Sequence, residues 1–271
     1  MENKEYKRVL SIAGTDPSGG AGIQADMKAF SACGCYATTA ITAVVDQNTK
    51  GVKAVHPIPV EFVQGQIDSV LEDVGADAIK IGMLHSSDLI LGIRDTLQKY
   101  DIKNIVLDPV MVATSGDTLL QEEAVETLKS ELIPMCRVLT PNLPEAEILL
   151  GEKINGQEDF PTYAKKLAKQ FSVSVLLKAG HLTGDDLIDI FYNIESDEIV
   201  ELPSKRVYTK NTHGTGCSFS SAIAAYLAHD LPMNEAVSKA KEYMIEAIVA
   251  GSSYKIGKGH GPIHHFYNFW E

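Results

Sequence analysis

The sequence predicts an α/β protein with three layers, in which a mainly parallel central sheet carries helices on both faces. Short apolar runs typical of buried strands alternate with stretches whose apolar residues recur at helical spacing. Such alternation is typical of β–α–β units. The chain has 271 residues, 45% hydrophobic and 22% charged, as expected of a folded protein. Because we find no repeat and no low-complexity linker, we expect one domain over residues 1–271.

The apolar runs predict the strands of this sheet. They lie at residues 8–13, 36–45, 77–81, 104–108, 137–140 and 173–178. The run at 36–45 has no polar alternation, so we expect a strand that is buried on both faces. Residues 186–209 break the alternation with short strand-like runs and polar turns, which is typical of an antiparallel edge.

Apolar residues at three- and four-residue spacing predict the helices between these strands. The positions are Ile23, Met27 and Phe30; Phe62, Ile67, Val70 and Leu71; Leu89, Ile93 and Leu97; and Val125, Leu128 and Leu132. Two more helices are predicted at 216–229 and 233–250. In such sheets ligands bind at the carboxyl ends of the strands. We therefore expect the site in the loops that begin at positions 14, 46, 82, 108, 141, 179 and 211.

The charge and the termini limit the partners of the chain. The formal net charge is -12, which argues against nucleic acid and anionic lipid as partners. The first residues are polar, and no apolar run reaches the length of a membrane helix, so we expect a cytoplasmic protein without a membrane partner. Four cysteines in a chain of this length do not make a disulfide framework. Cys33 and Cys35 are expected to be small residues in a helix-to-strand connection.

The sharpest motif is the glycine-rich segment 211–220, which runs directly into a helix of small apolar residues. Its glycines let backbone N–H groups converge, and the helix start adds the positive end of its dipole, so the turn can bind an anion. Cys217 lies at this helix start, where the pKa of a thiol is expected to fall. The candidate catalytic residues are Gly214, Thr215, Gly216 and Cys217. The alternative is a structural glycine loop before a buried helix with an inert cysteine.

The first loop, residues 14–22, also follows a strand and precedes a helix. It matches neither the P-loop pattern nor G-x-G-x-x-G. Its glycines allow the backbone to approach a ligand closely, or they form a purely structural turn.

Further candidates lie at the ends of later strands. Asp108 ends a strand, and Glu145 follows Asn142 in a turn that opens a helix; two acids near a phosphate suit hydrated Mg²⁺. Compensation of the helix dipole is the alternative role of Glu145. Lys178 can reach a phosphate as a point charge, or it is an ordinary strand end. His213 is a candidate phosphate contact. The other histidines lack metal-ligand spacing, so no metal is assigned to them.

Together these residues resemble the ribokinase-like superfamily of small-molecule kinases, and within it the hydroxymethylpyrimidine/phosphomethylpyrimidine kinases of thiamine biosynthesis. The resemblance extends from Ser11 to about Pro262. It rests on an ordered set of motifs, which are IAGTDPSGGAGIQAD (12–26), QNT (47–49), KIGML (80–84), LDPVM (107–111), TPNLPEAE (140–147), HGTGCSFSSAIAA (213–225) and GKGHGP (257–262). Each motif alone is weak, but the ordered set is specific.

The resemblance implies ATP-dependent phosphorylation of 4-amino-5-hydroxymethyl-2-methylpyrimidine and then of its monophosphate, with Mg²⁺, by a homodimer. It implies that Cys217 is the base, where most of the superfamily has an aspartate, in an anion hole of residues 214–217. It assigns the pyrimidine to Gln47, Ala21, Met83 and Val110; the nucleotide phosphates to Asn142 and Lys178, beside the candidate His213; and hydrated Mg²⁺ to Asp108 and Glu145.

Two departures from the family pattern leave alternatives open. Thr114 stands where many relatives have a lysine that is a candidate contact for a substrate phosphate, and Ala179 replaces the first glycine of KGGH. The first weakens the expectation of a second phosphorylation. A pyridoxine or pyridoxal kinase, or an enzyme of dual specificity, is the nearest alternative, although the QNT motif favours the pyrimidine. A non-catalytic binding protein is the alternative from another class, and it would have no use for a base at Cys217.

Overall fold

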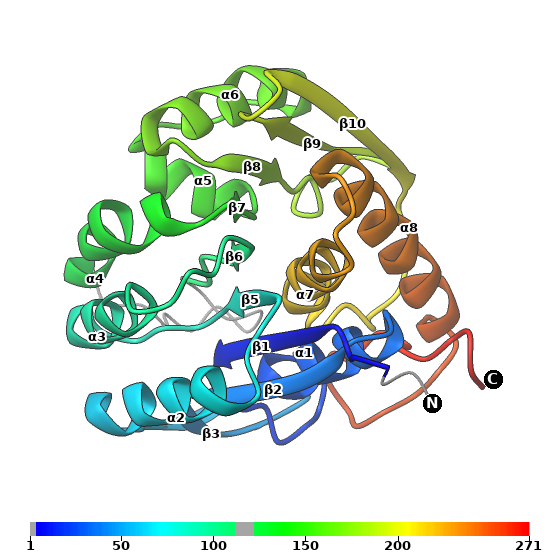
Figure 1. Ribbon diagram of the computed structural model, residues 1–271. Coiled ribbons are helices and arrows are strands. Elements are labelled where there is room, and N and C mark those ends of the chain that lie inside the picture. Colours follow the sequence, from blue (N-terminus) through cyan, green and yellow to red (C-terminus); the bar gives the residue numbers. More distant parts are fainter. Residues whose placement is uncertain (1–3, 112–121, 271) are drawn as a thin grey trace.

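The central sheet of the protein has eight strands, and six of them are parallel (Figure 1). The computed structural model describes residues 4–111 and 122–270. The strands are β1 (Arg8–Ala13), β2 (Tyr36–Ile41), β5 (Ala78–Ile81), β6 (Ile105–Leu107), β7 (Val138–Leu139), β8 (Ser174–Leu177), β9 (Asp186–Asn193) and β10 (Glu198–Lys205), in the order β10-β9-β8-β7-β6-β5-β1-β2. The strands β9 and β10 are antiparallel, which confirms the edge predicted at 186–209.

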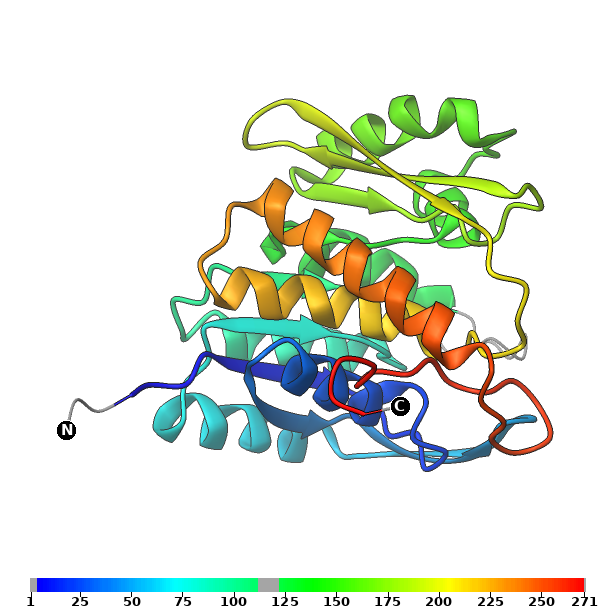
Figure 2. The same ribbon diagram turned by 90° about the vertical axis from the view of Figure 1, so that its right-hand side faces the viewer.

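Helices cover both faces of this sheet, so the three-layer prediction is confirmed. One face carries α1 (Gly22–Ala32), α7 (Thr215–Ala228) and α8 (Met233–Gly251), and Figure 2 shows α7 and α8 side by side. The other face carries α2 (Val60–Asp73), α3 (Ser87–Leu97), α4 (Glu122–Thr127), α5 (Leu143–Leu150) and α6 (Phe160–Phe171). A π-helical turn, Leu128–Leu132, and a 3₁₀ turn, Ile133–Met135, continue α4.

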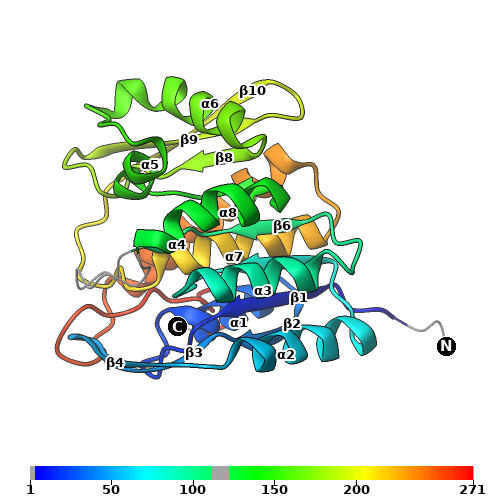
Figure 3. The same ribbon diagram turned by 90° about the vertical axis from the view of Figure 1, so that its left-hand side faces the viewer.

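The run predicted as one buried strand at 36–45 is two strands in two sheets. Strand β2 lies at the edge of the central sheet and is partly exposed. The chain turns at the buried Thr42, whose N–H donates to the carbonyl of Ala13 and whose hydroxyl donates to that of Met83. It continues as β3 (Ala43–Asn48), which pairs with β4 (Gly51–Pro57) in a separate hairpin. Figure 3 shows this hairpin extending past the sheet, on the side of its carboxyl ends.

The remaining helices follow from local patterns, although α6 was not predicted. Its buried residues Phe160, Ala164, Leu167 and Phe171 recur at helical spacing, which is a signal that the sequence carries. The two C-terminal helices begin and end within one residue of the predicted positions. All four cysteines are free, and Cys33 and Cys35 lie buried between α1 and β2, as expected. No helix in the described part of the chain is long and apolar enough to cross a membrane.

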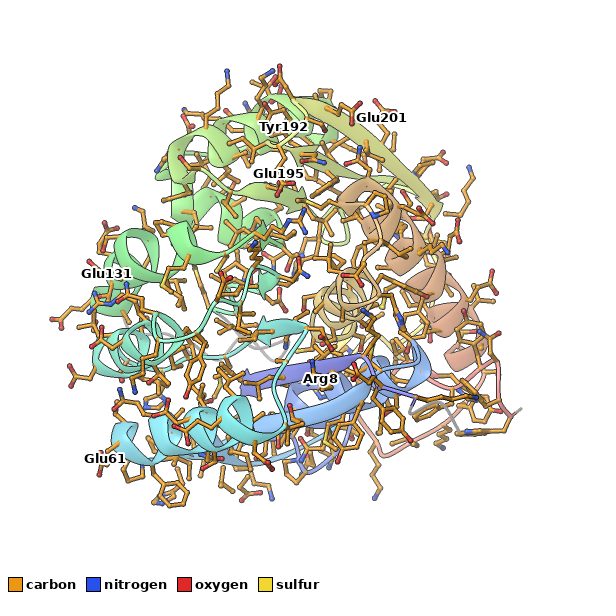
Figure 4. The ribbon with its side chains drawn as sticks, viewed as in Figure 1. Arg8, Glu61, Glu131, Tyr192, Glu195 and Glu201 are labelled. Carbon is orange, nitrogen blue, oxygen red and sulfur yellow. The ribbon has the colours of Figure 1, made fainter. Side chains whose placement is uncertain are left out.

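At the amino ends of the strands, ion pairs tie neighbouring strands together. The Arg8 guanidinium donates to both carboxylate oxygens of Asp77, at 3.1 and 2.9 Å, and joins the start of β1 to the residue before β5. Arg137, just before β7, reaches past β8 to Glu195, just after β9, and also donates to Asn104. Figure 4 labels Arg8 and Glu195 at this end of the sheet. These contacts leave the carboxyl ends free for a site.

Candidate active site

A cavity of about 1230 Å³ opens at the carboxyl ends of the parallel strands, and every site residue predicted from the sequence lines it. This is larger than a typical pocket for one small ligand, so it has room for a nucleotide and a second molecule. The lining residues that were predicted are Ala21, Gln47, Met83, Asp108, Val110, Asn142, Glu145, Lys178, His213, Gly214, Thr215, Gly216 and Cys217. Thr114 lies outside the described residues.

The start of α7 forms one wall of the cavity. Gly214 is the N-cap residue with a left-handed φ of 76°, and a Cβ there would lie 1.7 Å from the carbonyl oxygen of Gly20, so only glycine fits. A Cβ on Gly216 would come within 3.3 Å of Lys178 Nζ and 3.4 Å of Asp108 Oδ2. The two glycines therefore bring the helix start against both the first loop and the ends of β6 and β8. The first N–H groups of a helix have no partner within it, which suits an anion.

Cys217 is in the first turn of α7 and lines the cavity, but its pKa does not follow the expectation from the sequence. Burial raises the pKa of the thiol to about 11. The Lys80 ammonium is the strongest influence that lowers this pKa, and the Gly22 backbone N–H also lowers it. The carboxylates of Asp26 and Asp108 raise the pKa further. The prediction of a lowered pKa is wrong because the helix start lies in a buried, partly acidic region, where desolvation outweighs the dipole.

An ion pair joins the ends of β6 and β8 beside this turn. Lys178 Nζ donates to Asp108 Oδ1 at 2.8 Å, and the Thr140 hydroxyl donates to the same oxygen at 3.2 Å. Both charged side chains are nearly buried. Burial alone would lower the pKa of Lys178, but the charges of Asp108 and Glu145 outweigh burial and raise it. Lys178 therefore keeps its positive charge inside the cavity and is not the ordinary solvated strand end that the sequence left open.

Asn142 and Glu145 form a capping box at the start of α5. The side chain of Asn142 accepts from the backbone N–H of Glu145 at 3.0 Å, and the Glu145 carboxylate accepts from the N–H of Asn142 at 2.8 Å. Glu145 therefore has a hydrogen-bonding role at this helix start, whereas compensation of the helix dipole by its charge stays a prediction. Burial raises the pKa of this carboxyl to about 7, Lys178 opposes the rise, and Asp108 adds to it.

The two carboxylates fit hydrated Mg²⁺. Asp108 and Glu145 both line the cavity, and Mg²⁺ takes one or two carboxylates together with water and phosphate oxygens. A cage made only of protein groups is not available, because no cluster of three or more His, Cys, Asp or Glu side chains suited to a metal exists within residues 4–111 and 122–270.

At the other end of the cavity, Gln47 projects from the hairpin β3–β4. A β-bulge between Asp46 and Gln47 shifts the register there, and such bulges re-aim side chains. The tip of the hairpin is held by the segment 257–262, since Thr49 accepts hydrogen bonds from the backbone N–H groups of Gly259 and His260, at 3.1 and 2.8 Å. Gly261 in turn accepts from the N–H of His213. The GKGHGP motif thus fastens the hairpin to the anion-binding turn.

Asp16, which sequence reasoning missed, organises the first loop around the cavity. Its buried carboxylate accepts from the backbone N–H groups of Gly20 and Ala21 and from His213 Nε2, the last at 2.7 Å. Its other oxygen accepts from the N–H and the hydroxyl of Ser18, and its hydrogen bonds, that of His213 first, outweigh burial and lower its pKa. The signal was an acid in the middle of a glycine-rich loop. His213 Nε2 is therefore engaged by a carboxylate, which leaves only Nδ1 for the predicted phosphate contact.

Ala179, the second departure from the family pattern, is wholly buried, and its N–H donates to Asp189 at 2.7 Å. Its backbone N–H is therefore turned into the protein. Lys80 is a second residue that sequence reasoning missed, although it stood in a quoted motif as a lysine between two isoleucines of a buried strand.

The fold and this site define a small-molecule kinase of the ribokinase-like type: an anion-binding helix start, a buried lysine and two acids meet at the carboxyl ends of a parallel sheet. Comparison with known proteins agrees. The family described as phosphomethylpyrimidine kinase matches residues 16–264. The chain belongs to this family.

Relatives and solved structures extend the likeness over nearly the whole chain. The hydroxymethylpyrimidine/phosphomethylpyrimidine kinase of Rhizobium meliloti is 48% identical over 97% of this chain and 98% of its own length. The crystal structure of phosphomethylpyrimidine kinase from Clostridium difficile has a TM-score of 0.78 and 42% identity, covering 89% of this chain and 99% of its own. Pyridoxal kinase from Staphylococcus aureus in complex with AMP-PCP and pyridoxal has a TM-score of 0.88 and 33% identity, and the match covers 98% of this chain and 96% of that kinase.

Proposed function

We propose that the protein uses ATP to phosphorylate 4-amino-5-hydroxymethyl-2-methylpyrimidine and then its monophosphate, as a step in thiamine biosynthesis. The observation that carries this proposal is the convergence of the α7 turn, the Lys178–Asp108 pair and Gln47 on one cavity. The names of the relatives, which include thiamine biosynthesis proteins, support the same reaction. The complex of a solved relative with AMP-PCP supports ATP as the phosphoryl donor.

The residues of the chain divide the work of phosphoryl transfer. The N–H groups of residues 214–217 and the Lys178 ammonium bind the transferring phosphoryl group and stabilise its charge, which is the main requirement of this reaction. Cys217 accepts the proton of the substrate hydroxyl. Asp108 and Glu145 would hold hydrated Mg²⁺, which when bound neutralises charge on the nucleotide phosphates. Asn142, bridged to Lys178 across the ends of β7 and β8, positions those phosphates.

Gln47 reads the pyrimidine edge. Its side-chain amide carries an acceptor oxygen and N–H donors. The oxygen and one N–H together complement an amine beside a ring nitrogen. Ala21, Met83 and Val110 line the cavity around the ring. The Gly14 backbone packs closely against the Met83 side chain, since a Cβ on Gly14 would lie 2.6 Å from Met83 Cε.

Pyridoxal phosphorylation is the second candidate function, because solved pyridoxal kinases share this fold at 33–35% identity. An assay of ADP release, run in parallel with the hydroxymethylpyrimidine, its monophosphate and pyridoxal, separates the candidates. We expect the highest kcat/KM with the two pyrimidines. A higher kcat/KM with pyridoxal would overturn the proposal. Binding of the pyrimidine without ADP release would identify a non-catalytic binding protein.

We also propose that the protein is a homodimer. The support for this proposal is the family resemblance of the sequence. Light scattering on the purified chain tests this, with a mass near twice 29.4 kDa as the expected result. The cytoplasmic location stays a prediction from the sequence.

A further inference from the structure

A second ion pair lies under the active site, and no step above uses it. Lys80 Nζ on β5 donates to both carboxylate oxygens of Asp26 on α1, at 2.8 and 2.9 Å, and neither side chain has any exposed surface. The hydroxyls of Ser11 and Ser221 donate to the same carboxylate at 2.6 and 2.8 Å. Asp26 is therefore held from β1, β5 and α7 at once.

Stability alone is a poor explanation for this pair. Removing two charges from water costs several kcal/mol per ion, and well-packed apolar residues in place of a buried pair are often as stable or more stable. Gly82 leaves space for the Lys80 ammonium, since a Cβ on Gly82 would lie 2.8 Å from Lys80 Nζ. Burial alone would lower the pKa of Lys80, but the charges of Asp26, Cys217 and Asp108 outweigh burial and raise it. The ammonium is therefore permanent.

The positive end of the pair lies near Cys217. Lys80 lines the same cavity as Cys217, and α7 packs against both α1 and the strand β5. Among the groups around the sulfur, Lys80 from β5 has the largest effect that favours a thiolate. Asp26 from α1 and Asp108 from the end of β6 have smaller, opposite effects, and the Gly22 N–H at the start of α1 adds a favourable one. Ser221, one turn after Cys217 on α7, donates to the Asp26 carboxylate that binds the Lys80 ammonium, so Asp26 anchors this ammonium about one helical turn from Cys217. Lys178 at the end of β8 is the second cation that interacts with Cys217.

We propose that Lys80 is a positioning residue for phosphoryl transfer, whose ammonium, anchored by Asp26, stabilises the negative sulfur of Cys217. The inference rests on the proposed function for the step itself. In that step the sulfur takes the proton of the substrate hydroxyl, and the hydroxyl oxygen bonds to the γ-phosphorus. The bond from that phosphorus to ADP breaks, and ADP leaves with the electron pair. Afterwards the thiol returns the proton to water.

Removing the charge of Lys80 and removing the charge of Asp26 should shift the titration of the Cys217 thiol in opposite directions. The rate of alkylation of Cys217 by iodoacetamide is measured against pH in the full-length protein without substrates. Lys80→Gln should move the thiol midpoint to higher pH and slow alkylation at a fixed pH roughly tenfold, because one pKa unit is a tenfold change in thiolate. Asp26→Asn should move the midpoint to lower pH and speed alkylation. The charge-neutral double variant should lie between them.

A merely structural role would move both single variants in the same direction, and that result, or no shift in either, overturns the proposal. If Lys80→Gln fails to fold, Asp26→Asn still tests the proposal. A thiol midpoint at higher pH in Asp26→Asn than in the wild type would contradict it. Ser221→Ala removes one bond to Asp26 without changing charge and serves as the matched control. Cys217→Ser sets the background, because the other three cysteines are buried.

The alkylation profile does not depend on which substrate is phosphorylated, so it stands even if the proposed function fails. With an active enzyme, the acid limb of the kcat profile should move in the same directions as the alkylation midpoint. Movement of alkylation without movement of kcat would show that Lys80 acts on the thiol but that Cys217 is not the base.

Discussion

The two ends of the central sheet use the same chemistry in different surroundings. At the amino ends, the Arg8–Asp77 pair has side chains that are 38% and 26% exposed, and it ties two strand starts together. At the carboxyl ends, the Lys178–Asp108 pair is 12% and 3% exposed. The distances are similar, 2.9 and 2.8 Å, so the difference is in solvation. Solvated ion pairs stabilise the fold modestly. Buried charges beside a cavity act more strongly on groups within it, because little water screens their electric field.

This contrast predicts that variants at the two ends fail in different ways. Changes at the carboxyl ends should reduce turnover with little loss of stability. Changes at the amino ends should do the reverse. The predictions below test this separation, from the largest expected effect to the smallest.

Cys217→Ala should lower kcat by roughly 100-fold or more, the scale of a lost general base, while KM for ATP stays within a few-fold. The thermal midpoint should change little, since the side chain borders a cavity and is not packed in the core. Steady-state ADP release and thermal denaturation measure the two effects. Near-normal turnover would exclude Cys217 as the base and return it to the inert cysteine that the sequence left as an alternative.

Gln47→Ala should raise KM for the pyrimidine about tenfold and leave KM for ATP nearly unchanged, because the proposed role of the amide is to bind the acceptor and not the nucleotide. Asp46→Asn on the same hairpin is the matched control, since Asp46 is 63% exposed and its ion-pair partner Lys53 lies at 3.7 Å. Initial-rate kinetics with each substrate varied in turn give both constants. Equal increases in the two KM values would place Gln47 outside the acceptor pocket.

Asp77→Asn should lower the free energy of unfolding by about 1–2 kcal/mol at pH 7 without changing kcat, because it removes charged hydrogen bonds from Arg8. Those bonds lower the pKa of Asp77, with burial opposing them. The stability from a lowered carboxyl pKa is present above its ordinary value of 3.8 and is lost as pH falls through the folded value.

Urea denaturation of the wild type and of Asp77→Asn between pH 8 and pH 3.5 should therefore give a constant difference that shrinks only below about pH 4. Asp230→Asn, which breaks an exposed pair with Lys7, is the matched control and should cost less than about 0.5 kcal/mol. A loss of kcat in Asp77→Asn would break the separation between the two ends of the sheet.

Much of the fold followed from the sequence because period and apolar content are local properties. Strand β8 and helix α8 were predicted within one or two residues, since each presents an uninterrupted pattern. The prediction of one strand at 36–45 failed for a long-range reason. The two halves of this run look alike in sequence, and the chain turns between them where Thr42 bonds to the end of β1 and to the loop after β5. The hairpin partner β4 is mostly exposed, so it gave no buried pattern.

The site divides in the same way. The residue types at the loop positions indicated an anion hole, a lysine and two acids, and the structure brings all of these residues to one cavity. The sequence could not show how neighbouring groups change the pKa values and hydrogen bonds of these residues. The expected fall in the pKa of Cys217 is reversed by burial, the Nε2 of His213 is taken by Asp16, and Glu145 closes a capping box.

The sequence by itself thus determined the layer architecture, the loops that carry the chemistry and the family resemblance that names the reaction, because motifs and periodicity are written along the chain. Only the tertiary structure decided which charges share a buried volume. Lys80, Asp26 and Cys217 are far apart in sequence, and their effect on one another exists only where β5, α1 and α7 exclude water. Electrostatic effects depend on distance and burial, and neither is a property of a single residue or its neighbours in the chain.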